Sequence, residues 1–171
     1  MSVSKHREEA PETLNCMVIT VSDTRTKEND KSGKVVRDAL KSVGYFIPKY
    51  HVVKDEYEDI QHLIKEGGNG EDIDAIIING GTGIADRDTT FEAVRDLLEK
   101  EMPGFGELFR YLSYVEDIGS ASILSRAVAG VYHHKAIFSM PGSSGAVCLA
   151  MERIIVPELA HVVREIRKDL S

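Results

Sequence analysis

The 171-residue sequence is poor in cysteine, and this shortage argues against two kinds of scaffold. Its two cysteines, Cys16 and Cys148, lie far apart and form no CxxC pair. A disulfide framework needs more cysteines than this, and a structural zinc site needs them at short spacing. Both residues are therefore interpreted as buried thiols of a protein in a reducing compartment.

Positive charge and long apolar runs are also scarce. Lysine and arginine number 21 against 28 aspartate and glutamate residues, which gives a formal net charge of −7 without any long basic block. This excess of negative charge argues against binding to nucleic acid or to an anionic membrane. No apolar run approaches the ~18 residues of a membrane-spanning helix, and no signal peptide heads the sequence, so we expect a cytoplasmic protein.

The length predicts one domain with a sizeable core. Residues 1–13 are polar and include a proline, which indicates a flexible arm before a single domain at residues 14–171. Pro48 cannot donate to a sheet ladder, so the second strand is expected near an edge. The predicted strands are residues 16–21, 45–53, 73–78, 127–132 and 136–140. Their alternation with helical stripes predicts an α/β fold, a three-layer α/β/α sandwich with a mostly parallel sheet.

Local signals indicate where several helices begin and end. Gly67-Gly68 is expected to end the second helix, because glycine commonly follows the last helical residue. Thr89 and Glu92 have the spacing of a capping box and predict a helix that opens after Thr89. Pro157 is expected to begin the last helix at its first turn.

Apolar residues recur at i, i+3, i+4 and i+7 after Pro103, at Phe105, Leu108, Phe109 and Leu112. This spacing predicts that one face of a helix is buried. The segment 110–115 adds two tyrosines and is interpreted as a subunit contact. Further on, the last two strands lie on either side of His133-His134 and form either a hairpin or a strand and its neighbour, with the histidines in solvent.

Four polar turns follow apolar strands, at residues 22–25, 54–56, 79–88 and 141–145. In a parallel sheet the carboxyl ends of the strands meet at one edge, which is where ligands bind. Three of the polar residues also have purely structural interpretations. Asp23 would cap its own turn, Asp55 would cap the next helix, and Ser143 would be an N-cap that is still compatible with anion binding.

The turn after the third strand carries the most information. Its three glycines within residues 80–83 let the backbone approach a ligand and turn successive N–H groups into a concavity that suits anionic oxygens. The alternative is a tight turn with no ligand. Asp86 and Asp88 would repel a bound phosphate unless a cation lay between them, so the loop predicts magnesium held together with phosphates.

Five motifs occur together and in order: TVSDTR at 20–25, GGTGIADRDTTFEAV at 80–94, MPGFGELFRYLS at 102–113, SRAVAG at 125–130 and MPGSSGAV at 140–147. With them the sequence resembles the molybdenum cofactor biosynthesis protein B family, which is close to the Mog proteins and to the G domain of gephyrin. The resemblance runs from about residue 16 to the C-terminus. The combination is far more specific than any single glycine turn.

The resemblance implies an enzyme, a molybdopterin adenylyltransferase. It would transfer AMP from Mg-ATP to the terminal phosphate of molybdopterin and release pyrophosphate. The implied fold is the molybdopterin-binding α/β/α sandwich, assembled as a trimer or as a hexamer of two trimers. Such a transfer needs in-line placement of two phosphates and neutralisation of charge, and no general base.

The resemblance also implies roles for individual residues. Asp55 and Asp88 match the acidic residues that would hold magnesium for catalysis, and Asp23 matches an acidic position near the nucleotide. The nucleotide-phosphate loop is matched by Gly80, Gly81, Thr82 and Gly83. A turn beside the same pocket is matched by Ser125 and Arg126, and the pterin-side loop by Pro141, Gly142, Ser143 and Ser144.

Two departures from the Mog pattern bear on activity. Thr90 stands where many Mog proteins have a proline, and Ser144-Gly145 where they have a different loop. The three aspartates are all kept, which favours an active enzyme. Two alternatives remain: a protein that binds or delivers the pterin without catalysis, and a nucleotide pyrophosphatase or deamidase of the competence-induced type.

Overall fold

The computed structural model describes residues 10–170, so most of the predicted arm at residues 1–13 lies outside the described residues. A six-stranded sheet with the strand order β2-β1-β3-β6-β5-β4 forms the centre of the molecule. The strands are β1 (Asn15–Val21), β2 (Phe46–Val53), β3 (Ala75–Asn79), β4 (Lys100–Glu101), β5 (Val128–Tyr132) and β6 (Lys135–Met140). The first four in this order are parallel, and the pairs β6–β5 and β5–β4 are antiparallel.

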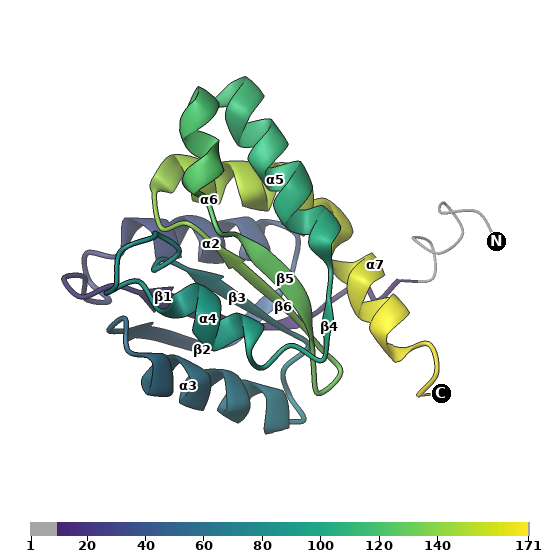
Figure 1. The fold of residues 1–171 in the computed structure, drawn as a ribbon. Coiled ribbons are helices and arrows are strands. Elements are labelled where there is room, and N and C mark those ends of the chain that lie inside the picture. Colours follow the sequence, from purple (N-terminus) through teal and green to yellow (C-terminus); the bar gives the residue numbers. More distant parts are fainter. Residues whose placement is uncertain (1–9, 171) are drawn as a thin grey trace.

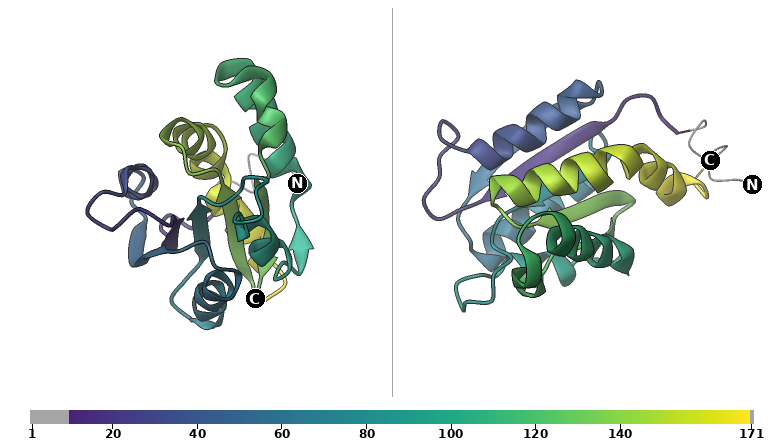
Figure 2. Two further views of the ribbon diagram at one scale, coloured as in Figure 1. Left: turned by 60° about the vertical axis from the view of Figure 1, so that its left-hand side comes forward. Right: turned by 90° about the horizontal axis from the view of Figure 1, so that it is seen from above.

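Helices cover both faces of this sheet (Figures 1 and 2). One face carries α2 (Lys31–Ser42), α5 (Pro103–Glu116), α6 (Ser144–Ala150), a π-helical turn η2 (Met151–Ile155) and α7 (Val156–Arg167). The other face carries α3 (Tyr57–Asn69) and α4 (Thr90–Arg95). A 3-10 helix, η1 (Gly119–Leu124), follows α5. The predicted three-layer α/β/α sandwich is confirmed, although its two outer strands β5 and β4 form an antiparallel margin.

The sheet is buried on both faces, which explains the continuous apolar runs of the sequence. Along β1, Val18 points into the core beneath α2 and α6, while Met17 and Ile19 point into the core beneath α3 and α4. In β3, Ile77 and Ile76 divide between the two cores in the same way. A strand that is covered on both faces has no polar side and shows no alternation of apolar and polar residues.

The strand predictions hold in two further details. β2, which contains Pro48, lies at the edge of the sheet as expected. β5 and β6 form an antiparallel hairpin, and its two turn residues, His133 and His134, both have positive φ, at 46° and 61°. Both histidines are exposed, as predicted. Two consecutive positive φ values match the right-handed twist of the flanking strands.

Gly67 and Gly68 do not end a helix, and this prediction is wrong. Both lie inside α3, which continues to Asn69. A Cβ on Gly67 would lie 2.7 Å from the Met17 sulfur, and one on Gly68 would overlap the Tyr132 ring. The glycines therefore allow α3 to approach the sheet closely, a requirement that comes from distant residues.

Pro157 lies in the first turn of α7, as predicted, but α7 follows α6 without a break. Helical backbone is continuous from Ser144 to Arg167, through the π-helical turn that precedes the proline. Within that turn the N–H of Val156 donates to the carbonyl oxygen of Met151, five residues back. Proline has no N–H and crowds the preceding turn, so a widened turn accommodates it inside a helix.

α5 buries a narrower face than its spacing predicts. Phe105 and Phe109 are buried and stack on each other, and Phe105 also packs edge-on against Phe138, but Leu108 is 45% exposed. α5 and η1 project beyond the sheet (Figure 1), so the outer side of α5 has no layer above it. Among the described residues, no helix combines the length and apolarity that crossing a membrane requires.

Candidate functional site

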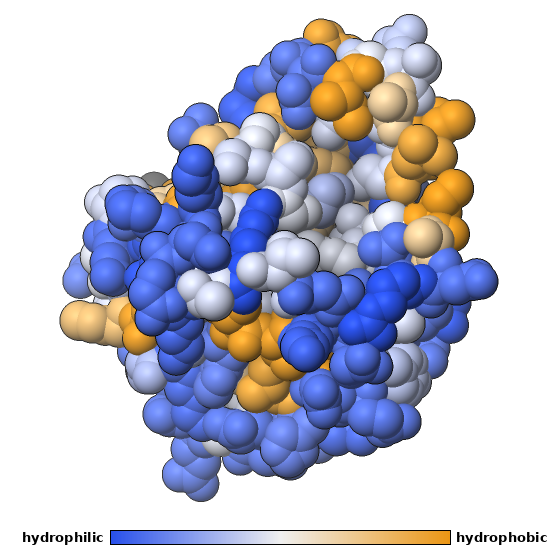
Figure 3. All heavy atoms as spheres, turned by 90° about the vertical axis from the view of Figure 1, so that its left-hand side faces the viewer, coloured by the Kyte–Doolittle hydropathy of each residue, from blue (hydrophilic) through white to orange (hydrophobic). Residues whose placement is uncertain are grey.

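The four parallel strands end at one edge of the sheet, and the four polar turns meet there. The Ser22 amide donates to the Val53 carbonyl at 2.8 Å, which joins the turns after β1 and β2. The Gly80 amide donates to the Met140 carbonyl at 3.0 Å, which joins the turns after β3 and β6. Hydrophilic residues dominate this face (Figure 3). The predicted convergence of turns 22–25, 54–56, 79–88 and 141–145 is thus observed.

Glycine is required at two positions of the loop after β3. Gly80 and Gly81 have φ values of +106° and +64°, in the region that other residues rarely adopt. A Cβ on Gly80 would overlap the Val21 carbonyl oxygen, and one on Gly81 would overlap the Thr90 hydroxyl. The sequence at 80–83 therefore packs the loop directly against β1 and the start of α4.

The same loop presents backbone amides without protein partners. Within residues 10–170, the N–H groups of residues 81–84 donate to no protein acceptor. The amides that follow are engaged: Ala85 donates to the Asp88 carboxylate at 3.1 Å, and Thr89 donates to Asp55 at 3.0 Å. Successive free amides at a turn form a concavity that binds anionic oxygens.

Asp55 lies beneath this loop and is only 5% exposed. Its Oδ1 accepts hydrogen bonds from the Thr89 amide at 3.0 Å, the Thr89 hydroxyl at 2.8 Å and the Thr90 hydroxyl at 3.3 Å. The prediction that Asp55 caps the following helix is wrong, because α3 is preceded by Glu56, which makes no side-chain cap bond. Asp55 instead holds the start of α4, which lies 34 residues further along the chain.

The capping box at Thr89 and Glu92 is not formed either. Thr89 makes no cap bond, and Glu92 pairs with Arg126. Asp55, in the turn after β2, instead accepts from the Thr89 amide and from the Thr89 and Thr90 hydroxyls, so the local spacing was misleading. α4 still begins at the predicted place, at Thr90.

Asp88 lies at the other side of the glycine loop. Its Oδ2 accepts from the Ala85 amide, and a Cβ on Gly83 would lie 2.5 Å from this oxygen. Asp88 also lines a cleft with Tyr57 and Ile84. Asp55 and Asp88 therefore flank residues 81–83 and contact Gly81 and Gly83 respectively.

Each of the two aspartates has an oxygen that could bind a magnesium ion. In the described part of the chain, Asp55 Oδ2 and Asp88 Oδ1 accept no hydrogen bond, so each carboxylate keeps one hard oxygen for a ligand. No cluster of three or more potential metal-binding side chains occurs among residues 10–170. Mg²⁺ typically takes one or two carboxylates and completes its shell with water and substrate phosphates.

Asp23 is held by an arginine of the acidic loop. Arg87 donates from Nε and Nη2 to the two Asp23 carboxylate oxygens, each at 2.9 Å, and its Nη1 lies 2.8 Å from Glu56. The hydrogen bond from Arg87 is the main reason that the pKa of Asp23 lies below its usual range. Asp23 Oδ1 also accepts the Asp55 amide at 3.1 Å. Its own turn is capped by Ser22, so the prediction that Asp23 does this is wrong.

Arg126 lies just before β5 and contacts the glycine loop through the carbonyl oxygens of the loop. Its guanidinium donates to the carbonyl oxygens of Thr82 at 3.3 Å, Gly83, and Asp88 at 3.4 Å. It also forms an ion pair with Glu92. The neighbouring Ser125 hydroxyl is buried without a partner in the described chain.

The loop after β6 lies against the glycine loop. A Cβ on Gly142 would lie 3.1 Å from the Gly80 Cα, so the two loops touch through glycines. Ser143 is the N-cap of α6, as predicted, and accepts from the Ala146 amide at 3.2 Å. Pro141 is half-buried and Ser144 is exposed at the same rim.

Sequence reasoning missed a polar group that supports this second loop. Arg25 donates to the Gly142 carbonyl at 3.3 Å and to the Ser32 hydroxyl. Ser32 donates in turn to Asn79 at 2.9 Å, and Asn79 donates to Thr20 at 3.0 Å. The only signal was that Arg25 and Asn79 stand where apolar strands end, which does not reveal their partners.

Three comparisons with known proteins show which family the chain resembles. Residues 17–161 match the family described as a probable molybdopterin binding domain. The chain is 64% identical over 169 residues to the molybdenum cofactor biosynthesis protein B of Halalkalibacterium halodurans, and 99% of each chain is covered. The protein of the same name from Bacillus subtilis is 61% identical over 169 residues, again with 99% of each chain covered.

The fold comparison gives the same result. A crystal structure of a molybdenum cofactor biosynthesis protein B matches with a TM-score of 0.90 and 52% identity, covering 94% of this chain and 99% of that one. The chain belongs to the molybdenum cofactor biosynthesis protein B family. Membership gives it a role in molybdenum cofactor biosynthesis, and the matched domain supports molybdopterin as its small-molecule partner. The family resemblance of the sequence is thereby confirmed.

Proposed function

We propose that this member of the molybdenum cofactor biosynthesis protein B family is an active molybdopterin adenylyltransferase. It transfers AMP from Mg-ATP to the terminal phosphate of molybdopterin and releases pyrophosphate. The observation that supports this most directly is the row of unpartnered amides at residues 81–84, flanked by Asp55 and Asp88. Amides bind phosphate oxygens, and the two carboxylates suit the magnesium ion that accompanies a triphosphate.

The proposal assigns one substrate to each of two touching loops. The triphosphate lies on residues 80–83, and molybdopterin lies on the loop 141–144, with Arg25 supporting the latter. Gly80 and Gly142 are in direct contact, so ligands on the two loops would meet at their phosphates. Bringing two phosphates into line supplies much of the rate enhancement in such transfers.

The chemical step needs little from side chains. The attacking phosphate of molybdopterin is ionised at neutral pH, so it needs no general base. Magnesium held by Asp55 and Asp88 would neutralise the charge that develops on the leaving pyrophosphate. Asp55 and Asp88 are therefore the catalytic residues of the proposal, and Asp23 positions Asp55 through its amide.

The test is pyrophosphate release from ATP by the purified chain, with and without molybdopterin. We expect release only when ATP, Mg²⁺ and molybdopterin are all present, and its loss in Asp88→Asn and in Asp55→Asn. The matched control is Asp96→Asn. Asp96 is an exposed aspartate at the end of α4 and pairs with Arg95 and Tyr57. Circular dichroism of each variant verifies that it is folded.

Other outcomes would select the alternatives. Binding of molybdopterin without any consumption of ATP would identify a pterin-binding or delivery protein. Release of AMP from ADP-ribose in the absence of pterin would point to a nucleotide pyrophosphatase. Normal turnover by both aspartate variants would contradict the assignment of catalytic roles.

We also propose that the chain assembles into a trimer or a hexamer through α5 and η1. Large apolar side chains are exposed on these two elements and on the turn between them, at Leu108, Tyr111, Tyr114, Val115, Ile118, Ile123 and Leu124. Apolar spheres gather over this projection at the top of Figure 3. A cluster of large exposed apolar side chains is typical of a protein–protein contact.

A further inference from the structure

The guanidinium of Arg126 faces the glycine loop and not the open rim. It donates to three loop carbonyls, those of Thr82, Gly83 and Asp88. No other arginine of the described chain contacts the loop carbonyls between residues 80 and 88. One planar group thus fixes three peptide units of the same loop, which a single-point ammonium could not do.

Peptide geometry determines where the matching amides point. All described peptide bonds are trans, so each N–H points opposite to the carbonyl of its own peptide unit. The carbonyls of Thr82 and Gly83 share their peptides with the amides of Gly83 and Ile84. Those two N–H groups therefore point away from Arg126.

The peptide unit between Asp88 and Thr89 has the same arrangement, and its N–H has an acceptor within the protein. Its carbonyl, on Asp88, accepts from Arg126, and its amide, on Thr89, donates to Asp55 at 3.0 Å. Arg126 and Asp55 thus hold opposite sides of one peptide unit. The amides of Gly83 and Ile84 have no such partner in the described chain and remain available to a ligand.

Two further contacts hold the Arg126 side chain in place. Glu92 on α4 forms an ion pair with it, and the Phe91 ring lies 5.0 Å from its guanidinium carbon. The side chain is only 24% exposed. A cation that is already paired with a carboxylate and three carbonyls has little capacity left for a phosphate.

We infer that Arg126 is a positioning residue that aims the Gly83 and Ile84 amides at the nucleotide phosphates, and that Ile84 contributes its backbone N–H to that site. This inference rests on the proposed function, because it takes a phosphate as the ligand of the loop. Ile84 contributes through its backbone, so its exposed side chain is free to vary.

Two measurements on the full chain test the inference. In the ligand-free protein, Arg126→Gln should speed hydrogen exchange of the Ala85 and Thr89 amides, whose acceptors are set by the loop conformation. By calorimetry, the same variant should bind Mg-ATP with a dissociation constant raised about tenfold, as expected for the loss of preorganised hydrogen bonds to a charged ligand. Arg126→Lys should recover little of this affinity.

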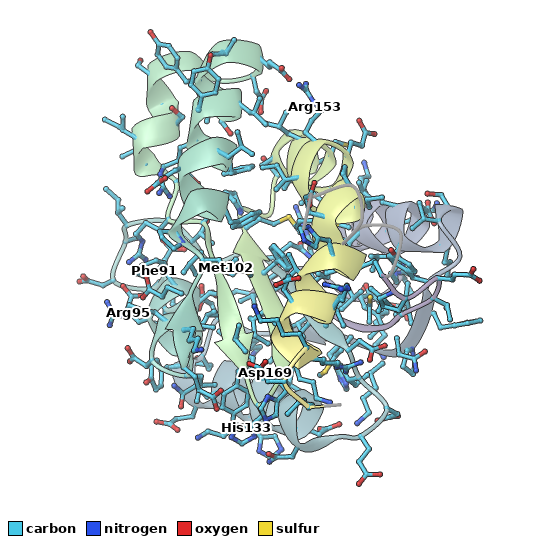
Figure 4. All side chains as sticks on the ribbon, turned by 90° about the vertical axis from the view of Figure 1, so that its right-hand side faces the viewer. Phe91, Arg95, Met102, His133, Arg153 and Asp169 are labelled. Carbon is cyan, nitrogen blue, oxygen red and sulfur yellow. The ribbon has the colours of Figure 1, made fainter. Side chains whose placement is uncertain are left out.

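Arg95→Gln is the matched control. Arg95 lies beside Phe91 (Figure 4), 5.5 Å from the centre of its ring, and pairs with Asp96, and in the described chain it donates no hydrogen bond to the loop. We expect the amide hydrogen exchange and the Mg-ATP affinity of Arg95→Gln to equal those of the unmodified chain. If Arg126→Gln does not fold, Glu92→Gln replaces it, since this change releases the guanidinium while leaving the arginine in place, and a smaller effect in the same direction is expected.

Three results would overturn the inference. Unchanged exchange in the free protein together with weaker ATP binding would mean that Arg126 touches the ligand directly. Full recovery of affinity by Arg126→Lys would mean that charge alone matters. Mg-ATP affinity within about twofold of the unmodified chain would mean that the loop needs no support. If the unmodified chain itself binds no Mg-ATP, the proposed function fails, whereas the exchange measurement still reports on the loop.

Discussion

The two oxygens of the Asp55 carboxylate differ in their hydrogen bonds to the protein. One oxygen accepts three hydrogen bonds from the start of α4, and the other accepts none within residues 10–170. The same residue can thus stabilise the fold and bind a metal ion. A replacement of Asp55 that keeps one acceptor oxygen should therefore preserve the stability of the fold while removing the metal ligand.

Asp55→Ala should lower the free energy of unfolding by about 2 kcal/mol, because it leaves the donors of part-buried Thr89 and buried Thr90 without an acceptor. Asp55→Asn should lose much less stability, since an amide oxygen can still accept from Thr89, yet it should lose adenylylation. Urea unfolding monitored by circular dichroism measures both. Equal stability of the two variants would show that the carboxylate does not hold α4.

The pair of Asp23 with Arg87 should respond to acid. The pKa of Asp23 in the folded protein is lowered, chiefly by the hydrogen bond from Arg87. The pair therefore stabilises the fold fully at pH values above the usual aspartate pKa of about 4. This stabilisation is lost as the pH falls through the lower pKa that Asp23 has in the folded protein. Arg87→Gln should move the Asp23 pKa back up towards its usual value. NMR titration of the carboxyl carbon measures this, and an unchanged pKa would contradict the pairing.

Cys16 should be chemically inert in the folded protein. Burial is the main reason that the pKa of its thiol rises to about 12, so almost no thiolate forms at neutral pH. Cys148 is only partly buried. Iodoacetamide should therefore label Cys148 first, as mass spectrometry of the native protein would show, and Cys16 only after unfolding.

At the scale of elements, α3 shows why glycine is ambiguous in a sequence. Gly67 and Gly68 resemble a helix stop, but the helix continues through them because Met17 and Tyr132 lie too close for a side chain. Such a requirement is set by residues far away in sequence. No local pattern reveals it.

Gly68→Ala should destabilise the protein by about 2 kcal/mol, because the added methyl overlaps the buried Tyr132 ring and outweighs the gain of about 1 kcal/mol in helix propensity. Gly104→Ala is the control, since the added Cβ would meet no atom within 4 Å near the start of α5. It should be neutral or stabilising. Thermal unfolding of both variants decides, and a stable Gly68→Ala would refute the close approach.

The strands could be predicted and the contacts between loops could not. β1 and β3 are continuous apolar runs because helices cover both faces, and this pattern is visible within a few residues. The role of Asp55 depends on Thr89, 34 residues away, and that of Arg126 on Thr82, 44 residues away. Spacing within a motif carries no information on such partners, so the predicted caps at Asp55 and Thr89 failed.

At the scale of the whole molecule, the projection of α5 and η1 leaves seven large apolar side chains in solvent, with Ile123 82% exposed. If this surface joins subunits, two charges placed within it should prevent assembly. Tyr111→Glu combined with Ile118→Glu should elute as one chain of 18.9 kDa in light scattering, whereas the unmodified chain should have three or six times that mass.

The control for assembly is Phe46→Glu, a change at an exposed apolar residue on the edge strand β2. This variant should keep the mass of the unmodified chain. Assembly that survives the double change, or that is lost in Phe46→Glu, would place the subunit contact on a different surface.

Gly80 and Gly142 are in close contact, so the loops after β3 and β6 are packed tightly against each other. A side chain added at Gly142 would press against Gly80, and one added at Gly80 would overlap the Val21 carbonyl oxygen. Room for a bulkier substrate therefore requires changes in both loops. Paired substitutions, one in each loop, are the starting point for redesigning the specificity of the pocket.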